Sequence, residues 1–217
     1  MTGFVIAVDG PAASGKGTVA AQLARDLGLP YLDTGLLYRA VGYAAAQPGC
    51  SEADAPMLAQ RLAPETLDNP ALRTREAGEL ASRVAVMPQV RQALFDFQRD
   101  FARRPRGAVL DGRDIGTVIC PEAPAKLFVT ARPEVRAERR WKQLTGQGEA
   151  VSFEDVLADI RIRDARDSGR EAAPLAQAAD AVLLDTSEMT IDQAADAARR
   201  IVEAARSEEH TSELQSQ

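Results

Sequence analysis

The sequence contains very little histidine or cysteine. Its one histidine, His210, stands close to the end of the 217 residues. Unless that end folds back, this excludes Ser-His triads, histidine acid–base catalysis and histidine-ligated metals. The two cysteines, Cys50 and Cys120, exclude a disulfide framework and a four-cysteine zinc site. We therefore expect a protein of the reducing cytoplasm.

Long apolar runs and excess positive charge are also missing. No stretch approaches the roughly 18 uninterrupted apolar residues of a membrane span, and no secretory signal is visible at the N-terminus. The net charge of −6 argues against a partner such as a nucleic-acid polymer held by bulk electrostatics. An anionic ligand must instead meet a local cluster of positive charge. Apolar residues make up 45% of the chain, which is ordinary for one sizeable core.

Short β-branched apolar segments alternate with segments of helical spacing. Strands are predicted at residues 4–9, 29–32, 108–111, 126–130 and 181–185. Helices are predicted at residues 18–27, 35–46, from 133 past 141, 153–168 and 191–205, and the segment 52–104 is mostly helical. This alternation predicts an α/β fold with a parallel sheet flanked by helices.

Composition divides the chain into a body and an end segment. Residues 1–206 are predicted to form a single domain, with the irregular middle and residues 142–172 as insertions. Residues 207–217 are polar and lack apolar periodicity. We predict an appended or disordered tail there, and the alternative is a frayed native terminus.

A glycine-rich loop follows the first predicted strand and precedes the first predicted helix. Its glycines let backbone N–H groups wrap a phosphate, its lysine reaches the terminal phosphates, and its threonine hydroxyl is a candidate ligand for Mg²⁺. The alternative, a glycine turn with a surface lysine, does not need this position between strand and helix. The loop predicts a nucleotide phosphate site made of Gly10, Pro11, Ala12, Ala13, Ser14, Gly15, Lys16, Gly17 and Thr18.

Two further polar clusters follow predicted strands. Thr34 and Arg39 stand at the start of a helix, where Thr34 either caps the helix or faces an anion with Arg39. Asp111-Gly112-Arg113-Asp114 follows the strand 108–111 and is either a charged surface turn or a polar recognition site. Ligands of parallel α/β sheets bind outside the carboxyl ends of strands, which favours recognition.

Arginines then concentrate on two predicted helices. Like charges four residues apart destabilise a helix by about 0.2–0.5 kcal/mol unless an anion compensates them. The alternative is a solvated helix with ordinary ion pairs, but two arginine faces near a phosphate loop suit phosphoryl transfer. The two groups are Arg136, Arg139 and Arg140, and Arg161, Arg163, Arg166 and Arg170.

With these clusters in view, residues 3–206 resemble bacterial cytidylate kinases of the P-loop nucleoside monophosphate kinase superfamily. Six motifs in order and spacing carry the resemblance: Asp9 to Thr18, Asp33 to Arg39, Leu72 to Glu76, Ser82 with Pro88 to Arg91, Asp111 to Val118, and Arg163 to Asp167 with Arg170 and Ala173 to Leu175. The resemblance implies a P-loop core, a monophosphate-binding insertion at about 40–90 and a mobile helical lid at about 140–172. Leu62 to Leu72 is shorter than the strand-containing insertion of many members.

The resemblance also implies a function and a set of site residues. The reaction is transfer of the γ-phosphoryl group of ATP, with Mg²⁺, to CMP or dCMP in pyrimidine metabolism, by an enzyme that is a monomer. Lys16, Arg139, Arg163 and Arg170 are then the catalytic residues, and Thr18 the metal ligand. The CMP site consists of Thr34, Arg39, Ser82, Arg91, Arg113, Asp114, Arg163, Asp167 and Arg170.

The chemistry of cytosine agrees with this assignment. A carboxylate such as Asp114 accepts from the N4 amine, and an arginine such as Arg91 donates to N3 or O2. Uracil presents an acceptor at position 4, which would face the carboxylate with no proton between them.

Three other functions stay open on sequence alone. The first is another P-loop kinase, for adenylate, shikimate or gluconate. The Asp-Gly-Arg-Asp turn and the Ser82/Arg91 pair argue against it. A GTP-dependent switch needs an Asn-Lys-x-Asp run, which the sole asparagine, Asn69, does not supply. A module that binds ATP without transfer has no need of Lys16 and two arginine faces.

Overall fold

The fold is built on a five-stranded parallel sheet. A computed structural model describes residues 3–215, and their side chains as far as residue 208. The strand order is β2-β3-β1-β4-β5, and every neighbouring pair is parallel, as the sequence predicts. The strands are β1 (Phe4–Asp9), β2 (Tyr31–Asp33), β3 (Gly107–Gly112), β4 (Ala125–Thr130) and β5 (Val182–Asp185).

The described residues contain eight α-helices, of which the last follows the last strand. They are α1 (Lys16–Leu27), α2 (Thr34–Ala45), α3 (Ala55–Gln60), α4 (Arg75–Val84), α5 (Pro88–Ala102), α6 (Pro133–Gly146), α7 (Phe153–Ser168) and α8 (Ile191–Gln215). The predicted α/β class is confirmed, and the segment 52–104 is mostly helical as expected. The strand predicted at 29–32 begins later, at Tyr31, because the Leu29 N–H donates to the Ala24 carbonyl and ends α1 around left-handed Gly28.

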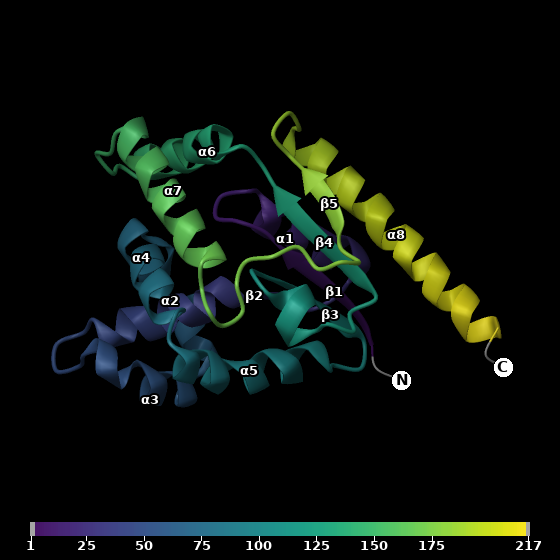
Figure 1. Cartoon of the computed structure of the whole chain (residues 1–217), viewed down its shortest axis with the longest axis horizontal. Coiled ribbons are helices and arrows are strands. Elements are labelled where there is room, and N and C mark those ends of the chain that lie inside the picture. Colours follow the sequence, from purple (N-terminus) through teal and green to yellow (C-terminus); the bar gives the residue numbers. More distant parts are fainter. Residues whose placement is uncertain (1–2, 216–217) are drawn as a thin grey trace.

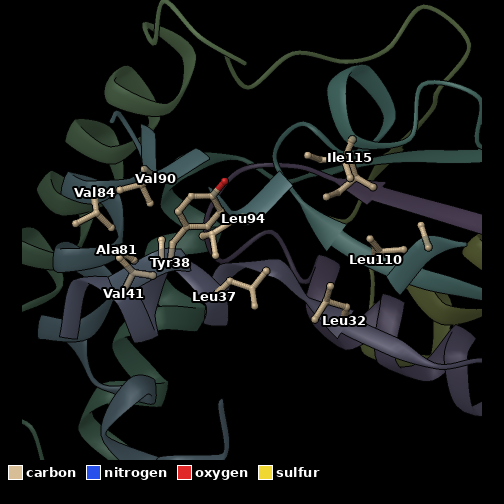
Figure 2. Close-up of a cluster of buried hydrophobic side chains, with 14 of the residues drawn as sticks. Leu32, Leu37, Tyr38, Val41, Ala81, Val84, Val90, Leu94, Leu110 and Ile115 are labelled. Atoms are coloured by element: carbon tan, nitrogen blue, oxygen red, sulfur yellow. The ribbon is translucent and has the colours of Figure 1, made fainter. Parts of the chain in front are cut away.

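Side chains of the strands alternate between two hydrophobic layers. Ala7 and Leu110 point to the layer formed with α2, α3, α4 and α5, whereas Ile6, Val8 and Val109 point to the layer under α1 and α8. Figure 2 shows the first layer, where Leu37, Tyr38 and Val41 of α2 lie between the α4–α5 side and the sheet. Packing of both layers against the sheet fixes the positions of the carboxyl ends of β1, β2 and β3 relative to one another.

The middle of the chain forms a helical insertion on one side of the sheet (Figure 1). Between α3 and α4 the chain makes 3₁₀ turns at Pro64–Asp68 and Pro70–Arg73, and no strand occurs there. The Thr74 hydroxyl caps α4 by accepting from the Ala77 N–H at 3.2 Å. The short connection predicted from Leu62 to Leu72 is therefore long enough only for turns.

Helices α6 and α7 form a hairpin with a small core of its own (Figure 1). Ala137 and Leu144 of α6 pack against Val156 and Ile160 of α7, with Trp141 beside them. This core is separate from the two layers of the sheet. The hairpin is the helical element that the sequence predicts near residues 140–172.

Helix α8 differs most from expectation. It continues to Gln215, whereas the sequence predicts a helix that ends at residue 205 followed by irregular chain. Its buried face ends earlier, with Ala198 and Val202 in the core and Ala205 beside it. Whether residues 207–217 are appended stays a prediction, and residues 216 and 217 lie outside the described residues. No helix in the described chain is long and apolar enough to cross a membrane.

Candidate active site

A cleft of about 850 Å³ lies where the phosphate loop, the helical insertion and the α6–α7 hairpin face one another. Loop residues 12–18 line one wall. Arg39 and Ser82 line a second wall from α2 and α4, and Arg113, Arg140 and Arg163 also face the cleft. The cleft therefore joins residues from separate parts of the chain. Eleven of the predicted site residues line it, namely loop residues 12–18 together with Arg39, Ser82, Arg113 and Arg163.

The shape of the phosphate loop depends on its glycines. Gly10 has φ +152°, and a Cβ there would lie 2.0 Å from the Val129 carbonyl oxygen, so no side chain fits. Gly15, which caps α1, has φ +90° in the left-handed region. The loop thus runs from the end of β1 to the start of α1, as predicted, with its backbone pressed against β4. Such a loop before a helix N-terminus is suited to binding phosphate.

Lys16 lies among carboxylates at the base of the loop. Burial lowers the pKa of its ammonium group, nearby Arg113 lowers it further, and Asp111 opposes the shift. Burial likewise raises the pKa of Asp111 to about 6, and the Tyr31 hydroxyl donates to this carboxylate at 3.0 Å. Burial disfavours the charged form of this lysine, and a bound anion would stabilise that charged form.

Arginines supply further positive charge to the cleft. Burial, then the charge of Arg140, lowers the pKa of Arg39 to about 10. Burial, then the charge of Arg113, lowers the pKa of Arg163 to about 9. The buried Nε of Arg163 has no hydrogen-bond partner. These shifts reveal positive charges that repel one another in a partly dry site, and a bound anion would relieve the repulsion.

Two of the predicted residues hold each other in a buried ion pair. Asp167 of α7 accepts from Arg113 Nε at 2.9 Å. Burial opposes both charges, but the pair outweighs it, so the pKa of Arg113 lies above and that of Asp167 below its ordinary value. Arg170 lies beside them, donates from Nε to the Asp167 carbonyl, and has a buried Nη2 without a partner.

Of the residues expected to read the base, Ser82 lines the cleft, whereas Arg91 and Asp114 are buried and do not line it. Arg91 of α5 and Asp114 form a buried ion pair, and the Arg91 guanidinium lies 5.6 Å from the centre of the Tyr38 ring. The hydroxyl of Ser82 accepts from Arg166 of α7 at 2.9 Å. These groups are therefore partnered with each other or with α7.

Thr34 is the first residue of α2 rather than its cap. Its buried hydroxyl donates to the Asp111 carbonyl oxygen at 2.7 Å, which joins the start of α2 to the end of β3. Asp33 stands in the cap position, without a side-chain hydrogen bond to the helix. The capping role considered for Thr34 is wrong, and its contact with an anion stays a prediction.

Arg139 lies apart from the main cleft. Its guanidinium donates to the Thr186 hydroxyl at 2.9 Å and carbonyl at 2.6 Å, and to the Ser14 carbonyl at 3.3 Å. It lines a second cavity of about 420 Å³ between the phosphate loop and the start of α8, with Met189 and Ile191. Its neighbour Arg140 lines both cavities.

Two arginines of the two predicted basic faces form ordinary ion pairs with acidic side chains. Buried Arg136 forms a two-pronged pair with Asp164 at 2.7 and 2.9 Å, and Arg161 pairs with Glu134 at 3.0 Å. For these two arginines, the solvated or paired helix face that the sequence left open is the better description. Arg163 and Arg170 keep the unpartnered atoms that an anion would satisfy.

Sequence reasoning gave no individual role to four residues of this region, although it counted Arg140 and Arg166 among the arginine groups and Asp111 in the Asp-Gly-Arg-Asp turn. Arg140 faces the main cleft, Arg166 contacts Ser82, Asp111 lies near Lys16, and Asp9 binds the turn after Asp114. Asp111 carried a signal, since it ends a strand beside the phosphate-loop strand. The sequence placed Arg140 and Arg166 in the arginine groups and Asp9 in the first motif, but it did not predict their individual contacts. Those contacts arise over long sequence separations or from the rotation of one helix.

Taken together, the parallel sheet, the phosphate loop after β1 and the arginine-lined cleft define a P-loop phosphotransferase. The cytidylate kinase family model matches residues 6–205, and the chain belongs to the cytidylate kinase family. A cytidylate kinase of Caulobacter vibrioides (strain NA1000 / CB15N) is 68% identical over 208 residues, covering 94% of this chain and 97% of the relative. One from Xanthobacter autotrophicus is 63% identical, covering 94% and 99%.

A solved structure supports the fold independently. The crystal structure of an uncharacterized protein from Eubacterium ventriosum ATCC 27560 is 16% identical, with a TM-score of 0.55, and the match covers 92% of this chain and 98% of that one. At that identity the likeness concerns the fold alone.

Proposed function

We propose that this chain transfers the γ-phosphoryl group of ATP to CMP or dCMP and forms CDP or dCDP, a step of pyrimidine nucleotide metabolism. One observation carries the proposal. The phosphate loop, Ser82 and the cations Arg39, Arg113 and Arg163 line one cleft, and the buried Nε of Arg163 has no hydrogen-bond partner. The buried pair suited to cytosine, Arg91 and Asp114, does not line this cleft, but both of its charges act on Arg170, whose Nη2 also lacks a hydrogen-bond partner. Family membership gives the same reaction.

ATP binds on the side of the phosphate loop. Backbone N–H groups of the loop hold its phosphates, and Lys16 lies against the terminal ones. The second cavity, with Met189 and Ile191 as apolar walls, accepts the adenine. Arg139 lies beside Gly15 in that cavity, so we assign it to ATP rather than to the migrating phosphoryl group.

The arginines of the cleft hold the acceptor phosphate and the migrating group. A phosphate oxygen of CMP forms the new bond to the γ-phosphorus while the bond from that phosphorus to the β–γ bridging oxygen breaks, and ADP leaves. Positioning and cations accomplish most of this transfer. We assign Lys16, Arg140 and Arg163 to the migrating group, and Arg39, Arg113 and Arg170 to the CMP phosphate, where the pair with Asp167 orients Arg113.

The site also fits Mg²⁺ bound together with ATP. Within residues 3–215 no group of three or more acidic, histidine or cysteine side chains forms a metal site by itself. Mg²⁺ commonly takes one or two protein oxygens plus phosphates and waters. The Thr18 hydroxyl would be its ligand, with Asp111 close to Lys16 as a carboxylate nearby. When bound, the ion neutralises charge on the β- and γ-phosphates.

Base recognition follows from the buried pair. Asp114 has a second carboxylate oxygen for the N4 amine, and Arg91 has further N–H groups for N3 or O2, so the pair presents an acceptor beside a donor. Cytosine presents a donor beside an acceptor and matches this order. Ser82 contributes a third polar group once its hydroxyl is shared with Arg166 or released from it.

We also propose that the insertion at about 40–90 and the hairpin at about 140–172 close over the two substrates, as the CMP-binding part and the lid of one domain. Two contacts already join them, Arg166 to Ser82 and Arg75 to Asp159, the latter with Nε at 2.8 Å. The enzyme is proposed to act as a monomer.

A coupled assay for ADP tests the function. ADP should form from ATP and Mg²⁺ when CMP or dCMP is present and should fall to the background rate without them. AMP, UMP, shikimate and gluconate serve as competing acceptors. If one of these is used as efficiently as CMP, the cytidylate assignment fails.

A further inference from the structure

A buried carboxylate outside the assigned site holds the turn that carries Asp114. Asp9, the last residue of β1, is 5% exposed. Its two carboxylate oxygens accept from the Ile115 N–H at 2.8 Å and from the Gly116 N–H at 2.7 Å. These donors lie more than a hundred residues away in sequence, directly after Asp114.

The two N–H groups begin a short π-helical turn, η4 (Ile115–Ile119). The first N–H groups of a helical turn have no partner within it. The Asp114 carbonyl closes the same turn by accepting from the Val118 and Ile119 N–H groups at 2.9 and 3.1 Å. Asp9 therefore accepts from the first N–H groups of the turn. Asp114 directly precedes these two N–H groups, and its own carbonyl accepts from the N–H groups at the end of the turn.

The turn has little room to move in any direction. A Cβ at Gly116 would lie 3.2 Å from the Lys126 side chain and 3.4 Å from an Asp9 oxygen. On the other side of Asp114, a Cβ at Gly112 would lie 2.7 Å from the Thr34 hydroxyl. The backbone around Asp114 is thus held from β1, β4 and α2, and the Asp9 carboxylate accepts from the Ile115 and Gly116 N–H groups.

We infer that Asp9 is a positioning residue for base recognition: through Ile115 and Gly116 it fixes the place of the Asp114 carboxylate beside Arg91. The inference rests on the proposed function. Asp9 also precedes Gly10, so the carboxylate links the first residue of the phosphate loop to the base-reading turn. A shift of about 1 Å in a recognition group can cost about 100-fold in efficiency. Loss of Asp9 should therefore change how the enzyme chooses its base.

The test compares Asp9→Asn and Asp9→Ala with the wild type, using CMP, UMP and ATP as varied substrates. Asparagine keeps one acceptor and alanine keeps none. We expect the KM for CMP to rise about 10-fold or more in Asp9→Ala and less in Asp9→Asn, while the KM for ATP changes about threefold at most. The ratio of kcat/KM for CMP over UMP should fall about 10-fold or more. Val202→Ala, a core change under α8, controls for lost stability and should leave that ratio unchanged.

The outcomes separate this inference from the function on which it rests. If the wild type does not prefer CMP, the proposed function fails. If the wild type prefers CMP and the Asp9 variants keep its CMP/UMP ratio, the positioning role is wrong, whatever happens to turnover. Should neither variant fold, hydrogen exchange on the wild type decides: the Ile115 and Gly116 amides must be as protected as those of β1, and rapid exchange there overturns the inference.

Discussion

The Arg91 guanidinium and the Asp114 carboxylate pair with each other in the protein interior, at 9% and 7% side-chain exposure. The two residues come from α5 and from the turn after β3, and each is a predicted reader of cytosine. Pairing keeps both of these buried charges satisfied. It also fixes which side of the base meets an acceptor and which meets a donor.

Base selectivity should depend on this pair. In the wild type, UMP places an acceptor against Asp114 and its N3–H against Arg91. Two unsatisfied buried groups cost about 2–6 kcal/mol, which corresponds to roughly 30-fold to over 10⁴-fold preference for CMP. AMP and GMP should be used less well still, because a purine must also fit.

Asp114→Asn should lower kcat/KM for CMP and narrow the CMP/UMP gap about 10-fold or more, because the amide can donate to O4 of uracil. Asp114→Ala should narrow the difference in kcat/KM between CMP and UMP too, but it leaves the buried Arg91 without its carboxylate partner and should unfold more easily. The measurement is kcat/KM for CMP, dCMP, UMP and AMP, with exposed Asp180→Asn as the matched control. An unchanged CMP/UMP ratio in Asp114→Asn would remove Asp114 from base recognition.

Lys16 should be essential for turnover but not for folding. Lys16→Ala should lower kcat about 100-fold or more, because the cation faces charge that develops on the transferred group. Burial disfavours the charged form of Lys16, so the melting temperature of the variant without nucleotide should equal or exceed that of the wild type. Lys142→Ala, at an exposed ion pair with Glu138, is the control and should change neither. Near-normal turnover in Lys16→Ala would overturn the phosphate-loop assignment.

Arg139 and Arg140 should have separable effects. Arg140 faces the main cleft, and Arg139 is bonded to Thr186 beside the second cavity. Arg140→Met should lower kcat about 10-fold or more with little change in the KM for ATP, since it removes a cation near the migrating group. Arg139→Met should mainly raise the KM for ATP. The reverse pattern would restore Arg139 as the residue that acts on the migrating phosphoryl group, as the sequence suggested.

The difference between Arg139 and Arg140 shows which features of the fold and site could be predicted from the sequence. The order of strands and helices along the chain and the place of the phosphate loop follow from local patterns, and their bounds were predicted within a few residues except at the end of α8. Adjacent residues on a helix point about 100° apart, so the choice between Arg139 and Arg140 depends on how α6 sits over the loop. No local pattern contains that rotation.

Contacts between residues far apart in the sequence could not be predicted either. Ser82 and Arg166 are 84 residues apart, and Asp9 and Gly116 are 107 apart. The sequence places each of them near the end of an element but does not pair them. The predicted end of α8 was wrong for another reason. Polar residues without an apolar face can extend a helix whose earlier turns are packed against the core.

Asp9 should also make stability depend on pH. Burial raises the pKa of its carboxyl from 3.8 to about 7, although the Gly116 and Ile115 N–H groups oppose the shift. Between these values the folded protein binds one proton more than the unfolded chain. The free energy of unfolding therefore falls as pH rises, by up to about 1.4 kcal/mol per pH unit from this group, and levels off above pH 7.

Asp9→Asn removes this dependence, so the wild type should lose about 2 kcal/mol relative to the variant between pH 5 and pH 7. Urea unfolding at pH 5, 6, 7 and 8 measures the difference. Asp180→Asn is the control: its carboxyl, a hydrogen-bond acceptor for Lys126, has a pKa below its ordinary value and titrates below this range. Its difference from wild type should stay constant from pH 5 to 8. A constant difference for Asp9→Asn as well would mean that Asp9 is already ionised at pH 5, held so by the two N–H groups of the turn.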